Sequence, residues 1–213
     1  IAGAYYLKSK VGYDPFLISG LGLTPAGLIA QRIDHSVQDT QSLALFGQVT
    51  YEILPDTRLT LGGRWTQDKR KYGARLMGDL FNDSPDAGFI PLAPANAFDA
   101  KKTFSEPTWR IGLDHRLNDD VLIYATYNRG FKSGIFNTTN PASPPVEPEI
   151  LDAFEAGFKS TALDNRMRLN AAAFYYDYKN IQLISQSGAS QLLVNAAKAR
   201  IYGVEASLDL AVT

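Results

Sequence analysis

The sequence predicts an all-β fold, an antiparallel up-and-down transmembrane β-barrel segment with about eight long strands. Three observations lead to this prediction. Apolar and polar residues alternate along many segments, and the connections between the segments alternate between short and long. The chain also has 24 aromatic residues (11 Tyr, 11 Phe and 2 Trp), which lie mostly in the alternating segments. A period of two is typical of strands with two different faces.

Composition excludes several other classes. The 213 residues include 21 Lys plus Arg against 22 Asp plus Glu, so the basic excess of a nucleic-acid binder is absent. The short basic run Lys69–Lys71 is interpreted as a solvated strand end. With no Cys, disulfides, thiolate metal sites and Cys nucleophiles are excluded. No run of 18 apolar residues occurs, so no transmembrane helix is expected, but a strand barrel crosses membranes without one.

The alternation defines the expected strands one by one. In order they lie in Ser42–Glu52, Thr57–Asp68, Trp109–Leu117, Val121–Phe131, a segment from Ile150 to Lys159 and a segment from Arg200 to Leu210. Val121–Phe131 makes about ten steps of roughly 3.3 Å, which at a tilt of about 40° rises about 25 Å, the height of the apolar band of a membrane barrel. Met167–Tyr178 has apolar residues on both parities, so its faces stay unassigned.

The connections follow a regular order. Tight turns are expected at Leu54–Thr57, Asn118–Asp120 and Leu163–Arg166, where Pro, Asp and Asn favour turns. Longer connections are expected at 10–35, 78–100 and 134–148, which are rich in Gly and Pro. Outer-membrane barrels have short periplasmic turns and long extracellular loops. Soluble sandwiches use mostly short loops at both ends.

Two stretches resemble the barrel domain of TonB-dependent outer-membrane receptors. The first is Tyr124–Gly134, followed by Val146–Glu149 and Phe154–Lys159, and the second is Arg168–Gln182, followed by Asn195–Glu205. The resemblance covers roughly Gln41–Leu210 and implies a barrel of the 22-stranded, plugged type. Residues 1–213 are then expected to be part of that barrel domain, without its plug and terminal strands.

The resemblance also implies a function. Such receptors bind a ferric siderophore or a similar nutrient at the outer face and import it with energy from the TonB complex, which contacts the plug region. The expected location is the bacterial outer membrane, with outer-membrane lipid around the barrel. No enzyme activity, cofactor, metal site or nucleic-acid partner is expected. The only two histidines, His35 and His115, are far apart in the sequence and have no further ligands at metal-site spacing.

Candidate ligand-binding residues follow the strand that leads into a long loop. They are Arg129, Lys132, Phe136 and Asn137, and their cations and aromatic ring suit a negatively charged ligand at the outer rim or lumen. The polar parity of the strands is expected to face the lumen through Arg64, Arg110, Asp114, Lys132, Glu155, Lys159, Glu205 and Asp209. Most of these are expected to form cross-strand ion pairs and plug contacts.

Two other functions remain open from the sequence. One is a small passive, porin-like channel of about eight strands, and the other is a soluble β module that binds a ligand. The soluble alternative conflicts with the many strands that carry apolar residues at every second position, because a soluble protein would then expose large apolar patches. The cargo and the register of strand pairing are not determined by the sequence.

Overall fold

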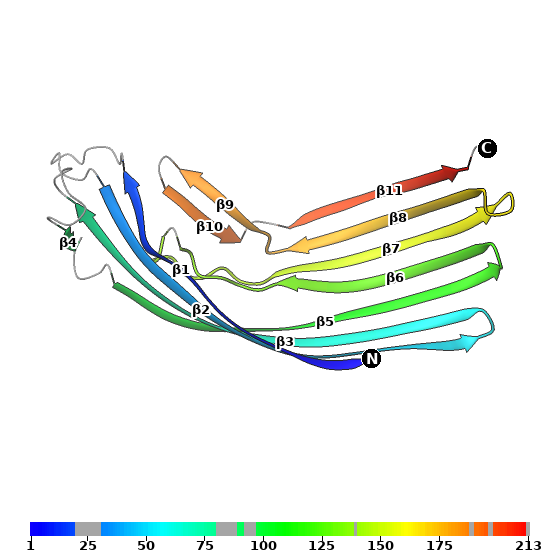
Figure 1. The fold of residues 1–213 in the computed structure, drawn as a ribbon, viewed down its shortest axis with the longest axis horizontal. Helices are drawn as coiled ribbons and strands as arrows, with labels where there is room; N and C mark the ends of the chain where they lie inside the picture. Colours follow the sequence, from blue (N-terminus) through cyan, green and yellow to red (C-terminus); the bar gives the residue numbers. More distant parts are fainter. Residues whose placement is uncertain are drawn as a thin grey trace.

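The computed structural model describes residues 1–19, 31–79, 89–91, 97–138, 140–187, 190–195 and 198–211. These residues form one long, curved antiparallel sheet (Figure 1). Its strands follow the order β1-β2-β3-β5-β6-β7-β8-β11, with the short β4 paired to β3, while β9 and β10 form a separate hairpin. The strands are β1 (Ala2–Ser19), β2 (Gln31–Leu54), β3 (Thr57–Asp79), β4 (Phe89–Pro91), β5 (Ala97–Asn118), β6 (Val121–Lys132), β7 (Glu149–Ala162), β8 (Met167–Lys179), β9 (Gln182–Ser187), β10 (Ser190–Asn195) and β11 (Ala199–Leu210).

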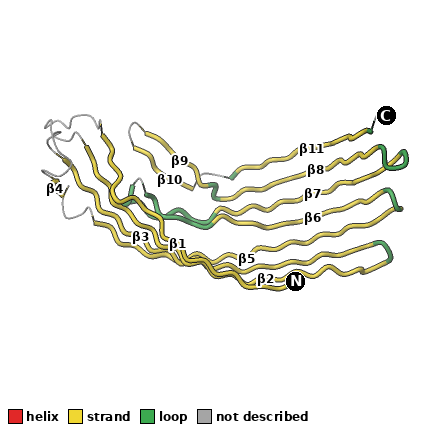
Figure 2. Tube along the Cα trace, viewed as in Figure 1, coloured by secondary structure: helices red, strands yellow, loops and turns green. Residues whose placement is uncertain are grey.

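This order confirms the predicted antiparallel sheet of about eight long strands. Each long strand pairs with its neighbour in the chain, except where β4 and the β9–β10 hairpin intervene. Figure 2 shows only strands, turns and loops among the described residues. No helix in that part of the chain is both long and apolar enough to cross a membrane.

The three predicted tight turns are confirmed and lie together at one end of the sheet, on the right in Figure 1. Asp56, between β2 and β3, has a φ of 60°, a left-handed conformation that Asp tolerates. Between β5 and β6, the backbone N–H of Asp120 donates to Oδ1 of Asn118 at 2.9 Å. Short polar side chains therefore shape these turns locally, which is why the sequence located them correctly.

Several strands are longer than the sequence predicted. β1 continues to Ser19, β2 begins at Gln31, and β3 continues to Asp79, within segments that were expected to be loops. Backbone hydrogen bonds between antiparallel strands do not need alternating side chains, so a ladder continues where the hydrophobic pattern has ended. Pro15, which has no N–H to donate, lies at a shift of register between Tyr13 and Phe16. The remainders of these expected loops, 20–30, 80–88 and 92–96, lie outside the described residues.

The register defines two faces of the sheet, because residues that are paired across antiparallel strands point to the same side. We call one the apolar face. One of its rows crosses seven strands and contains Val49, Leu61, Ile111, Tyr127, Phe154, Tyr175 and Tyr202. Many of these side chains are exposed, such as Val49, Tyr175 and Tyr202. A surface this apolar and this exposed needs a non-aqueous neighbour.

The opposite, polar face carries all eight residues that were expected to point inward. Pairing aligns Asp114, Tyr124, Gly157, Ala172 and Glu205 in one of its rows. Ion pairs across strands occur there as expected, with Arg58 Nη2 2.7 Å from Asp114 Oδ1. Tyr124 donates a hydrogen bond of 2.7 Å to Oε1 of Glu155.

The register also assigns the faces of β8, which the sequence left open. Ala171, Ala173 and Tyr175 pair with apolar-face residues of β7, so they belong to the apolar face. Asn170, Ala172 and Phe174 belong to the polar face. Alanines occur on both faces of this strand, so its hydrophobicity does not alternate from residue to residue. Successive side chains nevertheless still point to opposite faces of the sheet.

Candidate ligand and translocation surface

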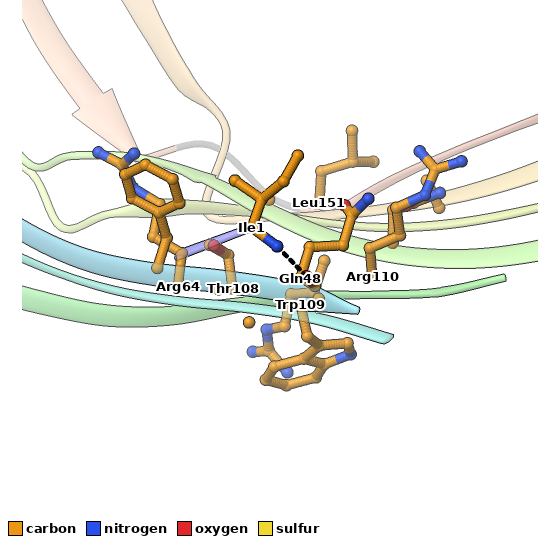
Figure 3. Close-up of a pocket in the computed structure, with 15 residues that line it drawn as sticks. Ile1, Gln48, Arg64, Thr108, Trp109, Arg110 and Leu151 are labelled. Carbon is orange, nitrogen blue, oxygen red and sulfur yellow. Dashed lines mark hydrogen bonds between the residues drawn. The ribbon is translucent and has the colours of Figure 1, made fainter. Parts of the chain in front are cut away.

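A hollow of about 500 Å³ opens on the polar face over β2, β3 and β5, next to the end of β6 and the start of β7. Its lining includes Gln48, Arg64, Arg110, Asn128 and Leu151. Figure 3 shows Gln48, Arg110 and Leu151 on one side of the sheet and the Trp109 ring on the other. The backbone of Ile1 is hydrogen-bonded to Gln48 at the edge of the hollow, through a contact of 2.8 Å.

Glycines deepen this hollow. Gly62 and Gly130 both point to the polar face, in adjacent rows of the register. A Cβ at Gly130 would meet no atom within 4 Å, so the space above that residue is open. The hollow therefore exists because small residues lie between the long side chains of Arg64 and Arg110, a feature that alternation alone does not reveal.

Two arginines of the polar face, Arg64 and Arg110, border the hollow. Nε of Arg64 donates to Oγ1 of Thr66 at 2.9 Å, and its guanidinium lies 5.4 Å from the ring centroid of Tyr5 and 5.8 Å from that of Phe46. Within the part of the chain that is described, neither Arg64 nor Arg110 has a carboxylate at ion-pair distance. Two guanidinium groups without counter-charges on one wall are suited to bind carboxylate, phosphate or other anionic oxygens.

Of the four candidate ligand residues, Arg129 and Lys132 lie on opposite faces of β6. Arg129 pairs with Trp109 and Asp152 on the apolar face, and its guanidinium lies 4.8 Å from the Trp109 ring centroid. Lys132 pairs with Glu149 on the polar face and is exposed. Their spacing of three residues along a strand already implies opposite faces.

Phe136 and Asn137 lie in the connection after β6, which folds back over the polar face. The Phe136 side chain is only 4% exposed and stacks on Tyr72 of β3. Asn137 is 1% exposed, its Nδ2 donates to the carbonyl of Leu193 at 3.2 Å, and its Oδ1 accepts from the backbone N–H of Asn140. Both side chains are therefore engaged within the chain, and the four candidates do not form one cluster.

A second group of polar residues was missed by the sequence reasoning. On the polar face of β2 and β3, beyond the hollow, a buried set consists of Asp34, Ser36, Ser42, Thr66 and Asp68. Three buried atoms there, Gln38 Oε1, Asp68 Oδ1 and Arg70 Nε, have no hydrogen-bond partner in the described part of the chain. Buried polar atoms are nearly always paired, so this set is suited to contact a further polar group.

Burial shifts two pKa values in this region. Burial lowers the pKa of Arg70, against the opposing effect of the Asp68 carboxylate. Burial also raises the pKa of Tyr72 to about 12, because its charged phenolate would lose solvation. The phenol of Tyr72 is thus neutral throughout the physiological range.

Glu147, Gln182 and Asn195 join the connection between β6 and β7 to the β9–β10 hairpin. The Gln182 side-chain amide donates to the carbonyls of Ser133 and Glu147 at 3.1 and 3.0 Å. Asn195 Oδ1 accepts from the N–H of Glu147 at 2.8 Å, and its amide donates back to the Glu147 carbonyl at 3.0 Å. These residues, which lie in the stretches that carry the family resemblance, have a structural role in holding the connections together.

Among the described residues, no group of three or more His, Cys, Asp or Glu side chains could hold a metal ion. His115 lies on the apolar face with Nδ1 2.8 Å from Oγ1 of Thr57.

Solved structures share this fold. The ferric yersiniabactin uptake receptor FyuA from Yersinia pestis superposes with a TM-score of 0.70 at 20% identity, over 97% of this chain and 29% of that one. The ferric-catecholate import receptor Fiu from Escherichia coli K12 gives a TM-score of 0.64 at 19% identity, over 100% of this chain and 32% of that one.

Curated proteins are similar in sequence as well. The pesticin receptor of Yersinia pestis is 25% identical over 170 residues, which cover 78% of this chain and 23% of that protein. A probable TonB-dependent siderophore receptor, PiuA, of Acinetobacter baumannii is 26% identical over 191 residues, which cover 84% of this chain and 22% of that protein. The chain thus spans about a quarter of the length of these relatives.

The family model for the TonB dependent receptor-like β-barrel matches residues 2–212, nearly the whole chain. This match agrees with the long antiparallel strands, the tight turns at one end and the exposed apolar face. It favours the receptor interpretation over the passive channel and the soluble module. The chain therefore belongs to the TonB-dependent receptor family and forms part of its bacterial outer-membrane β-barrel.

Proposed function

We propose that the receptor containing this chain imports a ferric siderophore or a similar metal chelate, energised through TonB. The names of its relatives support this cargo: a probable siderophore receptor, a ferric yersiniabactin uptake receptor and a ferric-catecholate import receptor. The polar face is then the wall of the import path, and the apolar face contacts lipid.

Within this chain, the support for the proposal is a pair of arginines on the polar face. Arg64 and Arg110 flank a hollow of about 500 Å³ without carboxylate partners in the described residues. A ferric chelate with carboxylate, hydroxamate or catecholate oxygens presents negative charge, which the two guanidinium groups attract. The arginines would thus hold or guide the cargo as it passes the wall.

The four candidate residues receive different roles in this proposal. Lys132 contributes a further cation to the polar face, beyond the hollow on β6. Phe136 and Asn137 shape the rim by fixing the connection after β6, through the Tyr72 stack and the Leu193 contact. Arg129 acts indirectly, because it lies on the apolar face beside Trp109.

The test uses the full-length receptor in a bacterial strain that lacks its other iron receptors. Growth under iron limitation is measured with a panel of ferric siderophores of the carboxylate, hydroxamate and catecholate classes. At least one chelate should restore growth only when both the receptor and TonB are present. If no iron chelate does so, while another nutrient is taken up through the receptor, the proposed cargo is wrong.

The arginines are tested with radioactive iron uptake at limiting chelate. The double variant Arg64→Gln/Arg110→Gln should lose about tenfold or more in uptake, since two charge-assisted contacts contribute roughly 1.5 kcal/mol or more. The control is Lys159→Gln, which removes a cation from the same face nearer the tight turns. Unchanged uptake by the arginine variant at equal surface abundance would exclude both arginines from the path.

A further inference from the structure

Charges of both signs lie on the polar face of β3 and β5, from Arg64 toward the end of the sheet that is opposite the tight turns. Arg64, Thr66, Asp68 and Arg70 occupy every second position of β3, so their side chains point to the same face. Glu106 of β5 belongs to that face as well, because it is paired with Thr66. We call Arg64, Asp68, Arg70 and Glu106 the mixed-charge group.

The members of this group are not compensated by opposite charges. In the part of the chain that the structure describes, none of the four side chains forms an ion pair. Arg64 donates to the hydroxyl of Thr66 at 2.9 Å, and Arg70 makes a long contact of 3.5 Å with the hydroxyl of Thr40. Both of these acceptors are neutral, so the charges themselves remain available to a further partner.

The register of the strands explains the missing ion pairs. Asp68 lies directly opposite Phe104 on β5, and Glu106 lies directly opposite Thr66 on β3. Side chains that are directly opposite on antiparallel strands make the closest cross-strand contacts. Because both carboxylates face uncharged residues, the sheet does not supply them with a cation.

Other charges of the same face show the contrast. Arg58 lies directly opposite Asp114, and the two form an ion pair of 2.7 Å. Lys102 has no carboxylate opposite it, but it forms an ion pair with Glu147 from the connection after β6. These charges are therefore paired within the chain, whereas the mixed-charge group is not.

Asp68 has the strongest need for an external cation. The residue is only 7% exposed, and its neighbours Thr66 and Ser42 are buried as well. Its Oδ1 is a buried atom without a hydrogen-bond partner in the described residues, and so is Nε of Arg70, two positions further along β3. A buried carboxylate is costly unless it is paired and hydrogen-bonded. The site thus has an unpaired acceptor and an unpaired donor side by side.

The arrangement of these groups defines the ligand that would satisfy them. Asp68 and Glu106 are diagonal neighbours on adjacent strands, a relationship that places the two residues about 7–8 Å apart. An ammonium group has three N–H donors and no acceptor, so it can donate to two carboxylates at once. Arg70 is the next residue of this face along β3, and Arg64 is diagonal to Glu106 on the other side. The matching ligand therefore carries an ammonium group beside anionic oxygens.

We propose that the imported chelate carries a free ammonium group, which Asp68 and Glu106 bind, while Arg64 and Arg70 bind its anionic metal-binding oxygens. This inference rests on the proposed function and narrows its cargo to chelates with an ammonium group that does not coordinate the metal. A purely anionic chelate would leave both carboxylates unpaired and would be repelled by them.

The test uses the full-length receptor in the iron-uptake assay described above, with pairs of ferric chelates that differ by one charge. One pair is ferrioxamine B, a trihydroxamate complex with a free ammonium group, and its N-acetyl derivative. Catecholate and carboxylate chelates built on lysine, with the side-chain amine free or acetylated, provide the other pairs. At limiting concentration, at least one free-ammonium chelate should be taken up about tenfold or more faster than its acetylated form, because charge-assisted contacts are lost.

The double variant Asp68→Asn/Glu106→Gln removes both charges and keeps the size of the side chains. It should abolish the preference, so that uptake of the free-ammonium chelate falls to that of the acetylated form, whose own uptake does not fall. The control, Asp39→Asn/Asp99→Asn, removes two carboxylates from the apolar face and should keep the preference. All variants are compared at equal surface abundance.

The proposal is overturned if both members of every pair are taken up equally, or if only chelates without an ammonium group are taken up. In either case the proposed import of iron chelates still stands. It is also overturned if the double variant slows both members of a pair by the same factor, which would mean that the carboxylates hold another part of the receptor. If no ferric chelate is taken up while another nutrient is, the proposed function and this inference are both wrong.

Discussion

The ring of Phe136 stacks on the ring of Tyr72, with centroids 5.4 Å apart and planes inclined by 12°. The two residues are far apart in the sequence, so this contact fixes the connection after β6 against the polar face of β3. Ala74, Phe98 and Ala100 complete the small apolar cluster around them. The cluster stabilises the sheet end where the proposed cargo would enter.

Phe136→Ala should release this connection. Loss of a buried aromatic side chain costs about 3 kcal/mol or more in a packed core, and in this small cluster the loss should appear as local opening. Hydrogen exchange of the full-length receptor should then show faster exchange in residues 133–148, with β6 and β7 unchanged. Phe136→Leu, which keeps most of the apolar volume, should preserve protection. Equal exchange in the alanine variant and the parent would contradict a structural role for the stack.

Asp152 lies at the centre of a charged cluster on the apolar face that also contains Arg129, Asp177, Lys179 and Arg200. The residue is 6% exposed, and its carboxylate accepts a hydrogen bond of 3.0 Å from Tyr127 and lies 2.8 Å from the Lys179 ammonium. Asp152→Asn should destabilise the receptor by about 1–3 kcal/mol, because two cations lose a buried partner. Urea unfolding in detergent measures the change.

Arg200→Gln serves as the matched control for that experiment. Its side chain is 69% exposed and lies 3.9 Å from Asp177, so its removal should cost less than about 1 kcal/mol. If both variants lose the same stability, burial of Asp152 has no energetic importance.

The sequence predicted those parts of the fold that depend on local chemistry. Alternation located the strands and their polar residues, and Asp56 and Asn118 marked turns by the side-chain chemistry of their own segments. The long extensions of β1, β2 and β3 were not predicted, because a backbone ladder leaves no mark on hydrophobicity. The faces of β8 needed the register, since Ala171, Ala172 and Ala173 look alike on both sides.

The candidate site was predictable only in part. Arg64 and Arg110 were correctly expected on the polar face, but the hollow between them depends on Gly62 and Gly130, which belong to different strands. The opposite directions of Arg129 and Lys132 were already implied by their spacing of three residues. The burial of Phe136 was not, since its partner Tyr72 is distant in the sequence and long-range pairing is set by the whole topology.

Tyr72 should titrate later than exposed tyrosines. Its pKa is raised to about 12 by burial, whereas an ordinary tyrosine titrates near 10. Because the folded state favours the neutral phenol, the contribution of Tyr72 to stability is complete below about pH 10. It is lost as the pH rises toward 12. In an absorbance titration near 295 nm, the Tyr72→Phe variant should have one tyrosine fewer that ionises at high pH than the parent receptor. An identical titration curve for the variant would show that Tyr72 is solvated in the intact receptor.

Gly157 and Gly130 provide a final comparison on the polar face. A Cβ at Gly157 would lie 2.5 Å from the carbonyl oxygen of Ala171 and 2.9 Å from the Tyr124 hydroxyl, whereas one at Gly130 would meet nothing within 4 Å. Gly157→Ala should therefore force β7 and β8 apart and cost about 1–3 kcal/mol in urea unfolding. Gly130→Ala should stay within about 0.5 kcal/mol of the parent. Equal stability of the two variants would mean that the β7–β8 pairing has room for a methyl group and is looser than the register implies.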